Sequence, residues 1–148
     1  MLTDIYNYHR IDDRIGTAGQ PTADQFKEIA AAGFQSVINL ALHTSDDAIP
    51  DEGSIVTGLG MTYIHIPVDF ETPDPQDFAL FSAAMDACQD RHVFVHCAAN
   101  KRVSAFLYVY RLNSGEVARE TAAADLHKLW KPDEVWSSFI TRVSSNAT

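Results

Sequence analysis

The chain has 148 residues, 46% of them apolar, which is enough to bury one hydrophobic core and predicts a single domain over residues 1–148. Lys and Arg number 11 against 20 Asp and Glu, giving a formal net charge of −9. We therefore expect neither a nucleic acid nor an anionic membrane as a partner. An anionic ligand would need a local binding site, because the field of the whole protein repels it.

The first residues carry neither the basic region nor the apolar run of a secretory signal. No apolar stretch reaches the roughly 18 to 20 residues that span a bilayer. Cys88 and Cys97 are the two cysteines, which is typical of a reducing compartment rather than of a disulfide scaffold. These features predict a cytoplasmic protein.

Strand and helix patterns alternate along the chain. Thr22 and Gln25 form a capping box at the start of one helix, and Asp74 followed by Pro75 opens another. Apolar periodicity and the Gly and Pro positions predict helices over 23–32, 51–59, 75–88, 103–112, 116–129 and 132–143, and strands over 36–40, 62–68 and 93–95. This order predicts an α/β fold with a mostly parallel central sheet flanked by helices.

The stretch from Val95 to Ser104 places Cys97 where an apolar strand ends and Arg102 where an apolar helix begins. The backbone N–H groups of residues 98–102 can turn toward one point, and the helix N-terminus adds partial positive charge there. Such a field stabilises a thiolate and the oxygens of an anion that the thiolate attacks. The alternative is an inert cysteine packed in the core.

This arrangement of strand, His-Cys, short loop with Arg, and Ser near the helix start resembles the cysteine-dependent phosphatases of the compact dual-specificity type. The segment Arg14–Pro21, the helix after it and residues 36–40 resemble the entry segment of that fold. The chain is similar to a bacterial family of phosphatase-like domains that also occur fused to metallo-β-lactamase-like hydrolases. The resemblance covers roughly residues 5 to 140. It implies a three-layer fold and catalysis without a metal or cofactor.

The resemblance also implies roles for individual residues. Cys97 would be the nucleophile, Arg102 would clamp the phosphoryl group, and Ser104 would ease departure of the thiolate. His96 would orient the loop from beneath, although a satisfied core histidine is an equally good interpretation. The amides that bind the phosphoryl oxygens would be those of Ala98, Ala99, Asn100 and Lys101. The partner would be a phosphorylated protein, a phosphorylated small molecule or another oxyanion.

The loop departs from the family signature, which has five residues between Cys and Arg and then Ser or Thr. Here four residues separate Cys97 from Arg102, and Val103 precedes Ser104. In one alignment Val103 occupies the arginine position and the clamp is lost. In the other Arg102 keeps its role in a shorter loop, and Asn100 adopts the left-handed conformation that the turn requires. The apolar spacing of Val103 with later residues of the helix favours the second alignment.

A phosphatase of this type also needs a proton donor for the leaving group. Asp69 follows the strand predicted over 62–68 and is the first candidate, and Asp74 and Asp77 are its competitors. Asp74 is better explained as a helix N-cap. Glu52 and the pair Asp46-Asp47 flank another loop and are interpreted as solvated surface.

Other conspicuous residues have structural explanations. Cys88 lies on the apolar stripe of its helix, so core packing is favoured over a role as a resolving thiol. Trp130 and Trp136 are expected to anchor the C-terminal helices to the core. The six histidines show no spacing typical of metal ligands.

Three functions fit these observations. The first is a phosphatase that works through a cysteinyl-phosphate intermediate. The second is a rhodanese-like sulfurtransferase, whose loop is also short and whose thiolate would carry a persulfide. The third is a module that binds oxyanions or phosphoproteins but turns over poorly.

Overall fold

The computed structural model describes residues 1–144, so the last four residues of the predicted domain lie outside the described part. A five-stranded sheet has the order β1-β2-β5-β3-β4. The strands are β1 (His9–Arg10), β2 (Ile15–Ala18), β3 (Ser36–Asn39), β4 (Thr62–His65) and β5 (Val93–His96). Only the pairing of β1 with β2 is antiparallel within this sheet. The expected mostly parallel sheet is confirmed.

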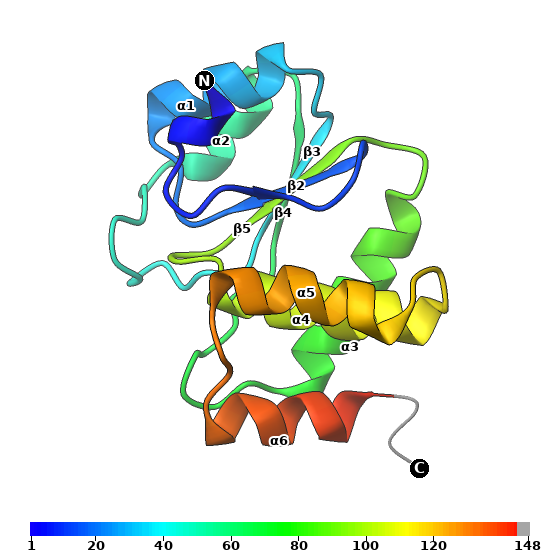
Figure 1. Cartoon of the computed structure of the whole chain (residues 1–148). Coiled ribbons are helices and arrows are strands. Elements are labelled where there is room, and N and C mark those ends of the chain that lie inside the picture. The colour runs from blue at the N-terminus through cyan, green and yellow to red at the C-terminus, as the bar shows by residue number, and fades with distance from the viewer. Residues whose placement is uncertain (145–148) are drawn as a thin grey trace.

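Helices cover both faces of the sheet (Figure 1). They are α1 (Ala23–Ala31), α2 (Glu52–Gly58), α3 (Pro75–Ala87), α4 (Lys101–Ser114), α5 (Arg119–Leu129) and α6 (Glu134–Val143), preceded by a short 3-10 turn, η1 (Leu2–Asp4). One buried cluster joins the sheet to α1 and α2, and a second joins it to α3, α4 and α6. The three-layer α/β fold inferred from the sequence is confirmed.

Strand β5 lies in the middle of this arrangement and pairs with β2 on one edge and β3 on the other. Its side chains alternate between the two layers: Val93 and Val95 pack toward α3 and α4, whereas Phe94 packs toward α1. A strand buried on both faces is expected to be continuously apolar, as this one is. The end of β5 is therefore held in place from four sides.

The helix starts follow the predicted capping. The Thr22 hydroxyl accepts a hydrogen bond from the Gln25 N–H at 3.2 Å, and the Gln25 side chain accepts one from the Thr22 N–H at 2.9 Å. Asp74 Oδ1 accepts a bond from the Gln76 N–H at 2.9 Å, with Pro75 as the first residue of α3. These contacts satisfy N–H groups that have no partner within the helix.

Of the residues predicted to pack in the core, Trp136 and Cys88 are buried, and Trp130 is partly buried against the same cluster. Trp136 is fully buried against Phe106 and Phe139, which confirms that it anchors α6. Cys88 is 5% exposed and belongs to the core cluster of α3.

The sequence did not predict β1 and β2. Strand β1 has only two residues, and β2 contains Gly16 and Ala18, which carry little strand propensity. The structure explains Gly16, because a Cβ atom there would lie 2.9 Å from the Phe34 ring. The predicted strand over 62–68 ends at His65, and α5 and α6 begin a few residues later than expected.

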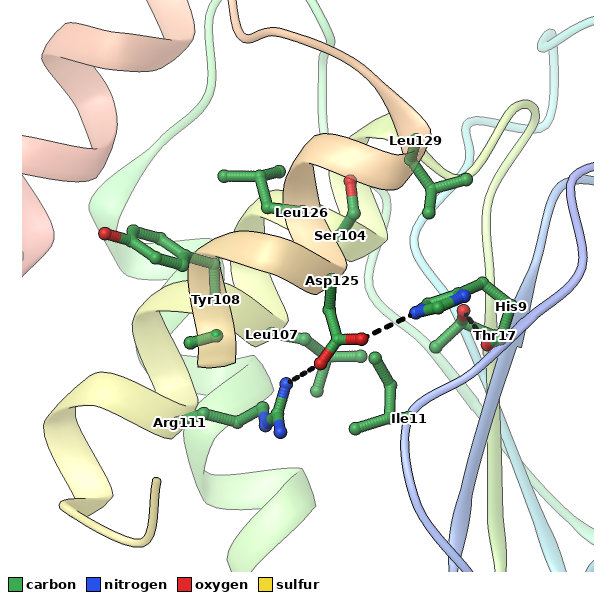
Figure 2. A pocket seen from close by; sticks show the side chains of 11 residues that line it. His9, Ile11, Thr17, Ser104, Leu107, Tyr108, Arg111, Asp125, Leu126 and Leu129 are labelled. Carbon is green, nitrogen blue, oxygen red and sulfur yellow. Dashed lines mark hydrogen bonds and ion pairs between the residues drawn. The ribbon is translucent and has the colours of Figure 1, made fainter. Parts of the chain in front are cut away.

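An ion-pair cluster ties β1 to α4 and α5 (Figure 2). Asp125 Oδ2 lies 2.6 Å from Arg111 Nη1, and its Oδ1 lies 2.8 Å from His9 Nε2. Burial acts to raise the pKa of Asp125, but the hydrogen bonds from Arg111 and His9 outweigh it and hold that pKa below its usual value. The ionised carboxylate is therefore the form that the folded protein binds.

We expect Asp125→Asn to lower the free energy of unfolding by about 1 to 3 kcal/mol at neutral pH, because Arg111 loses its buried partner. A carboxyl whose pKa is depressed on folding stabilises the protein above its unfolded pKa of about 3.9, and this stabilisation disappears as pH falls through the folded value. Urea unfolding at several pH values should show the wild type and the variant converging below pH of about 4. Glu120→Gln, an exposed substitution on the same helix, is the control. Equal losses in both variants would contradict the assignment.

Candidate active site

The loop between β5 and α4 forms one wall of a pocket of about 410 Å³. Cys97 lies at its base with no exposed surface, directly after the end of β5. Ala98, Ala99, Lys101 and Arg102 line the same pocket, which has Asp69 and Phe70 on another wall. The structure thus brings the predicted nucleophile, the predicted clamp and the first candidate acid around one cavity.

The loop turns into α4 at Asn100, which adopts the left-handed conformation with φ 63° and ψ 15°. Helix α4 begins at Lys101, and the N–H of Ser104 donates to the Asn100 carbonyl at 3.2 Å. The amides that precede this bond have no carbonyl partner one turn earlier, as at every helix N-terminus. They and the helix dipole favour an anion beside Cys97.

The side chain of Asn100 holds this turn in place. Its Nδ2 donates to the Asn7 carbonyl and to the Thr17 hydroxyl, both at 2.9 Å. In return, Asn7 Nδ2 donates to the Ala99 carbonyl at 3.0 Å. Asn100 is fully buried, so these bonds join the loop to the N-terminal segment and to β2.

The side chain of Arg102 points to the pocket, and that of Val103 points to the core. Arg102 is 6% exposed, its Nη1 donates to the Val68 carbonyl at 2.9 Å, and its guanidinium carbon lies 6.0 Å from the Phe70 ring centroid. Val103 is fully buried in the core cluster. This geometry agrees with the alignment in which Arg102 keeps its role within a loop that is one residue shorter.

The three candidate acids lie in different places in the structure. Asp69 is exposed and lines the pocket, where its Oδ1 accepts a hydrogen bond from the Glu71 N–H at 2.9 Å. Asp74 caps α3, as expected. Asp77 lies in the first turn of α3, where burial and the charge of Asp74 raise its pKa. Of the three, Asp69 is therefore the one that the structure places beside Cys97.

Ser104 is not brought to this pocket. Its hydroxyl donates to the Lys101 carbonyl at 3.1 Å and accepts a bond from Trp130 Nε1 at 3.0 Å. It lines the small cavity around Asp125 instead (Figure 2). Its role in thiolate departure stays a prediction, and this placement gives that prediction no support.

Lys101 is exposed at the mouth of the pocket. Its Nζ lies 5.5 Å from the Trp130 ring centroid and 5.9 Å from that of Phe70. These cation–π contacts keep the ammonium group close to the aromatic wall. Its backbone N–H belongs to the first turn of α4.

His96 lies beneath the loop, on the side of the sheet that α1 and α2 cover. Its Nδ1 is 3.1 Å from the Cys97 carbonyl oxygen, and its Nε2 is 2.6 Å from Glu52 Oε2. The interpretation of Glu52 as solvated surface was wrong, because Glu52 is only 4% exposed. Asp46 and Asp47 are exposed, as expected. The alternation along β5, which turns His96 toward the same layer as Phe94, was the signal that His96 needs a partner from α1 or α2.

Two features are absent from the described part of the chain. Within residues 1–144, no set of three or more His, Cys, Asp or Glu side chains is arranged to hold a metal ion. In the same part of the chain, no helix has both the length and the apolar character needed to cross a bilayer.

We expect Asn100→Ala to destabilise the protein more than Asn100→Gly. Both variants lose the bonds to Asn7 and Thr17, but only alanine also meets the steric cost of a left-handed residue, about 1 to 2 kcal/mol. Urea unfolding of the two variants measures this difference. Equal stabilities would mean that the turn relaxes to another conformation.

Comparisons with known proteins agree with this geometry. Residues 6–138 match the family model described as "DSP-PTPase phosphatase fused to NAD+ Kinase". A beta-lactamase hydrolase-like protein of Agrobacterium fabrum is 31% identical over 113 residues, which is 74% of this chain and 26% of that protein. The chain thus spans about a quarter of the length of the curated relatives it matches.

Solved structures show the same fold. A DUF442 protein of Shewanella putrefaciens CN-32 is 36% identical and superimposes with a TM-score of 0.88 over 99% of this chain and 96% of that chain. Tk-PTP in its active form is 16% identical, with a TM-score of 0.79 over 95% of this chain and 97% of that chain. The chain belongs to the DSP-PTPase phosphatase family and shares the fold of the protein tyrosine phosphatase-like structures.

Proposed function

We propose that the protein hydrolyses phosphate monoesters through a cysteinyl-phosphate intermediate, with Cys97 as nucleophile. The observation that carries the proposal is the common pocket of Cys97, Arg102 and Asp69 at the N-terminus of α4. The loop amides of residues 98–102 and the guanidinium of Arg102 bind the three non-bridging phosphoryl oxygens. These donors stabilise the charge that develops on the phosphoryl group in the transition state.

In the first step, the Cys97 thiolate attacks phosphorus and forms an S–P bond while the P–O bond to the leaving group breaks. The carboxyl group of Asp69 gives its proton to the departing oxygen. In the second step, water attacks phosphorus and the S–P bond breaks. Asp69, now a carboxylate, takes the proton of that water, and Cys97 leaves as a thiolate, so the enzyme returns to its starting state with inorganic phosphate released.

Burial and a hydrogen bond hold the guanidinium of Arg102 near Asp69, the proposed acid. Arg102 is 6% exposed and bound to the Val68 carbonyl, so its guanidinium is already positioned next to the residue before Asp69. A planar guanidinium can donate two parallel hydrogen bonds to a phosphoryl group, which a lysine ammonium cannot do. The same residue thereby connects the phosphate site to the segment that carries the acid.

The substrate class is a phosphorylated protein or small molecule. Pseudomonas aeruginosa TpbA, which shares the fold with a TM-score of 0.70 and 14% identity, has been solved in complex with phosphotyrosine. The complete burial of Cys97 supports a substrate whose phosphate extends far enough to reach the base of the pocket.

The test of this function is hydrolysis of a small aryl phosphate. We expect the wild type to hydrolyse it and vanadate to inhibit it, because vanadate adopts the geometry of the transition state. Cys97→Ser should reduce the rate to background, whereas Cys88→Ser, at a core position away from the pocket, should keep the activity of the folded protein. Thiocyanate formation from thiosulfate and cyanide without ester hydrolysis would instead support sulfur transfer. Phosphate binding with neither activity would support a binding module.

The acid is tested by varying the leaving group. We expect Asp69→Asn to slow hydrolysis of an alkyl phosphate by about 10² to 10⁴, the usual contribution of a positioned acid. The effect on an ester with a stable phenolate leaving group should be far smaller, because that oxygen departs without a proton. Steady-state kinetics with the two esters measure the difference.

Asp74→Asn is the matched control for this experiment, because asparagine also caps helices well and Asp74 lies a few residues along the same segment. A leaving-group-dependent loss in Asp74→Asn and not in Asp69→Asn would reverse the assignment. If neither variant shows it while hydrolysis still depends on Cys97, Asp69 is not the acid.

A further inference from the structure

Glu52 is buried where an exposed residue was expected, and both of its carboxylate oxygens are occupied. Oε2 lies 2.6 Å from His96 Nε2, and Oε1 accepts a hydrogen bond from Gln20 Nε2 at 2.8 Å. The Tyr63 hydroxyl also acts to lower the pKa of Glu52. A carboxylate that is 4% exposed is tolerated only when it is paired and hydrogen-bonded in this way.

The hydrogen-bond partners of His96 define its protonation. Its Nδ1 faces the Cys97 carbonyl oxygen at 3.1 Å, and a carbonyl oxygen can only accept a hydrogen bond. Nδ1 must therefore carry a hydrogen. The other nitrogen, Nε2, faces a carboxylate oxygen at the short distance typical of charge-assisted bonds. A neutral imidazole has one N–H and cannot donate to both oxygens, so this geometry requires a second proton between His96 and Glu52.

The environment of Glu52 bears on which partner holds that second proton. Burial acts to raise the pKa of Glu52, but the hydrogen bond and charge of His96, together with the Gln20 amide, outweigh it and hold that pKa below its usual value. Burial raises the pKa of Tyr63 to about 12, so its hydroxyl stays protonated and able to donate. An ionised Glu52 accepts from Nε2, which fits the short contact between the two side chains.

We propose that Glu52 is a positioning residue that keeps His96 doubly protonated, so that the ring holds the Cys97 carbonyl and places a positive charge beneath the sulfur. This inference rests on the proposed role of Cys97 as nucleophile. It assigns to the α2 layer a part in catalysis, although Glu52 touches neither substrate nor sulfur. The arrangement is comparable to a catalytic triad, in which a buried carboxylate fixes the protonation and orientation of a histidine.

The charged groups closest to the His96–Glu52 pair lie on its outer side, beyond Glu52. Phe26 of α1 packs edge-on against the His96 ring at 5.8 Å between centroids. The titratable groups that face the pair are Cys97 from the loop and Tyr63 from β4. Beyond Glu52, a hollow is lined by Asp51, His43 and His65. A variant that removes one negative charge from this hollow is therefore the appropriate control.

The experiment is the rate of Cys97 alkylation by iodoacetamide as a function of pH, in a Cys88→Ser background. Glu52→Gln keeps the size of the side chain and can donate its amide to Nε2, which allows a neutral imidazole with hydrogen on Nδ1. We expect this variant to fold and its Cys97 to be alkylated about tenfold more slowly at neutral pH. The profile of alkylation rate against pH should be shifted to higher pH. Asp51→Asn, an exposed acid at the start of the same helix, should follow the wild type.

An unchanged profile in folded Glu52→Gln would overturn the proposal, and so would an equal change in Asp51→Asn. Should Glu52→Gln fail to fold, the imidazole nitrogen resonances of His96 in the nitrogen-15-labelled wild type provide a second measurement. A doubly protonated ring at neutral pH supports the proposal, and a neutral tautomer overturns it. Neither measurement uses a phosphate ester. If the protein did not hydrolyse phosphate esters while alkylation of Cys97 still depended on Glu52, the proposed function would fail and the inference about Glu52 would stand.

Discussion

The position of Cys97, the proposed nucleophile, depends on strand β5. Its backbone is hydrogen-bonded to β2 on one edge and to β3 on the other, and its side chains are buried in both helical layers. The strand therefore cannot shift without breaking two ladders and two cores at once. Because side chains alternate, the same strand sends His96 toward α2 and leaves Cys97 facing the pocket. The sheet thus places His96 beneath the loop and Cys97 on the side of the pocket.

Neighbouring segments hold the short loop between β5 and α4 in its conformation. Asn100 accepts the left-handed conformation and is bound by groups from two other segments. Gly19 lies against the loop so closely that a Cβ atom there would come within 2.5 Å of the Ala98 carbonyl oxygen. Arg102 then lies in the first turn of α4, one position closer to Cys97 than the arginine of the family signature. Since each helical residue turns about 100°, burying Val103 leaves Arg102 directed to the pocket.

The sequence predicted much of this arrangement, because its signals are local. The apolar run of β5, the Asp74 cap and the left-handed Asn100 each follow from a few neighbouring residues. Strand β2 was missed because Gly16 and Ala18 are selected by close packing against other elements, which a single sequence does not reveal. Glu52 was misjudged for the same reason. Its helix is short and carries a weak pattern, and its partner His96 is far away in the chain.

Ser104 is a predicted site residue whose side chain lies away from the Cys97 pocket. A hydroxyl near the start of the helix suggested the family role, but a shift of one position along a helix also rotates the side chain by about 100°. The hydroxyl then meets Trp130 and the Lys101 carbonyl instead of the sulfur. These contacts give the predicted role of Ser104 in thiolate departure no support.

Electrostatics at the pocket are local. The chain carries a net charge of −9, and Asp46, Asp69 and Glu71 line the pocket beside Lys101 and Arg102. A phosphorylated substrate is thus not attracted from a distance, and beyond roughly 10 Å the field is screened in any case. Its binding must come from short-range contacts with the loop amides and Arg102. A site that binds anions only through short-range contacts selects substrates whose phosphate can reach the base of the pocket. The shape of the pocket mouth therefore contributes more to specificity than the overall charge of the protein.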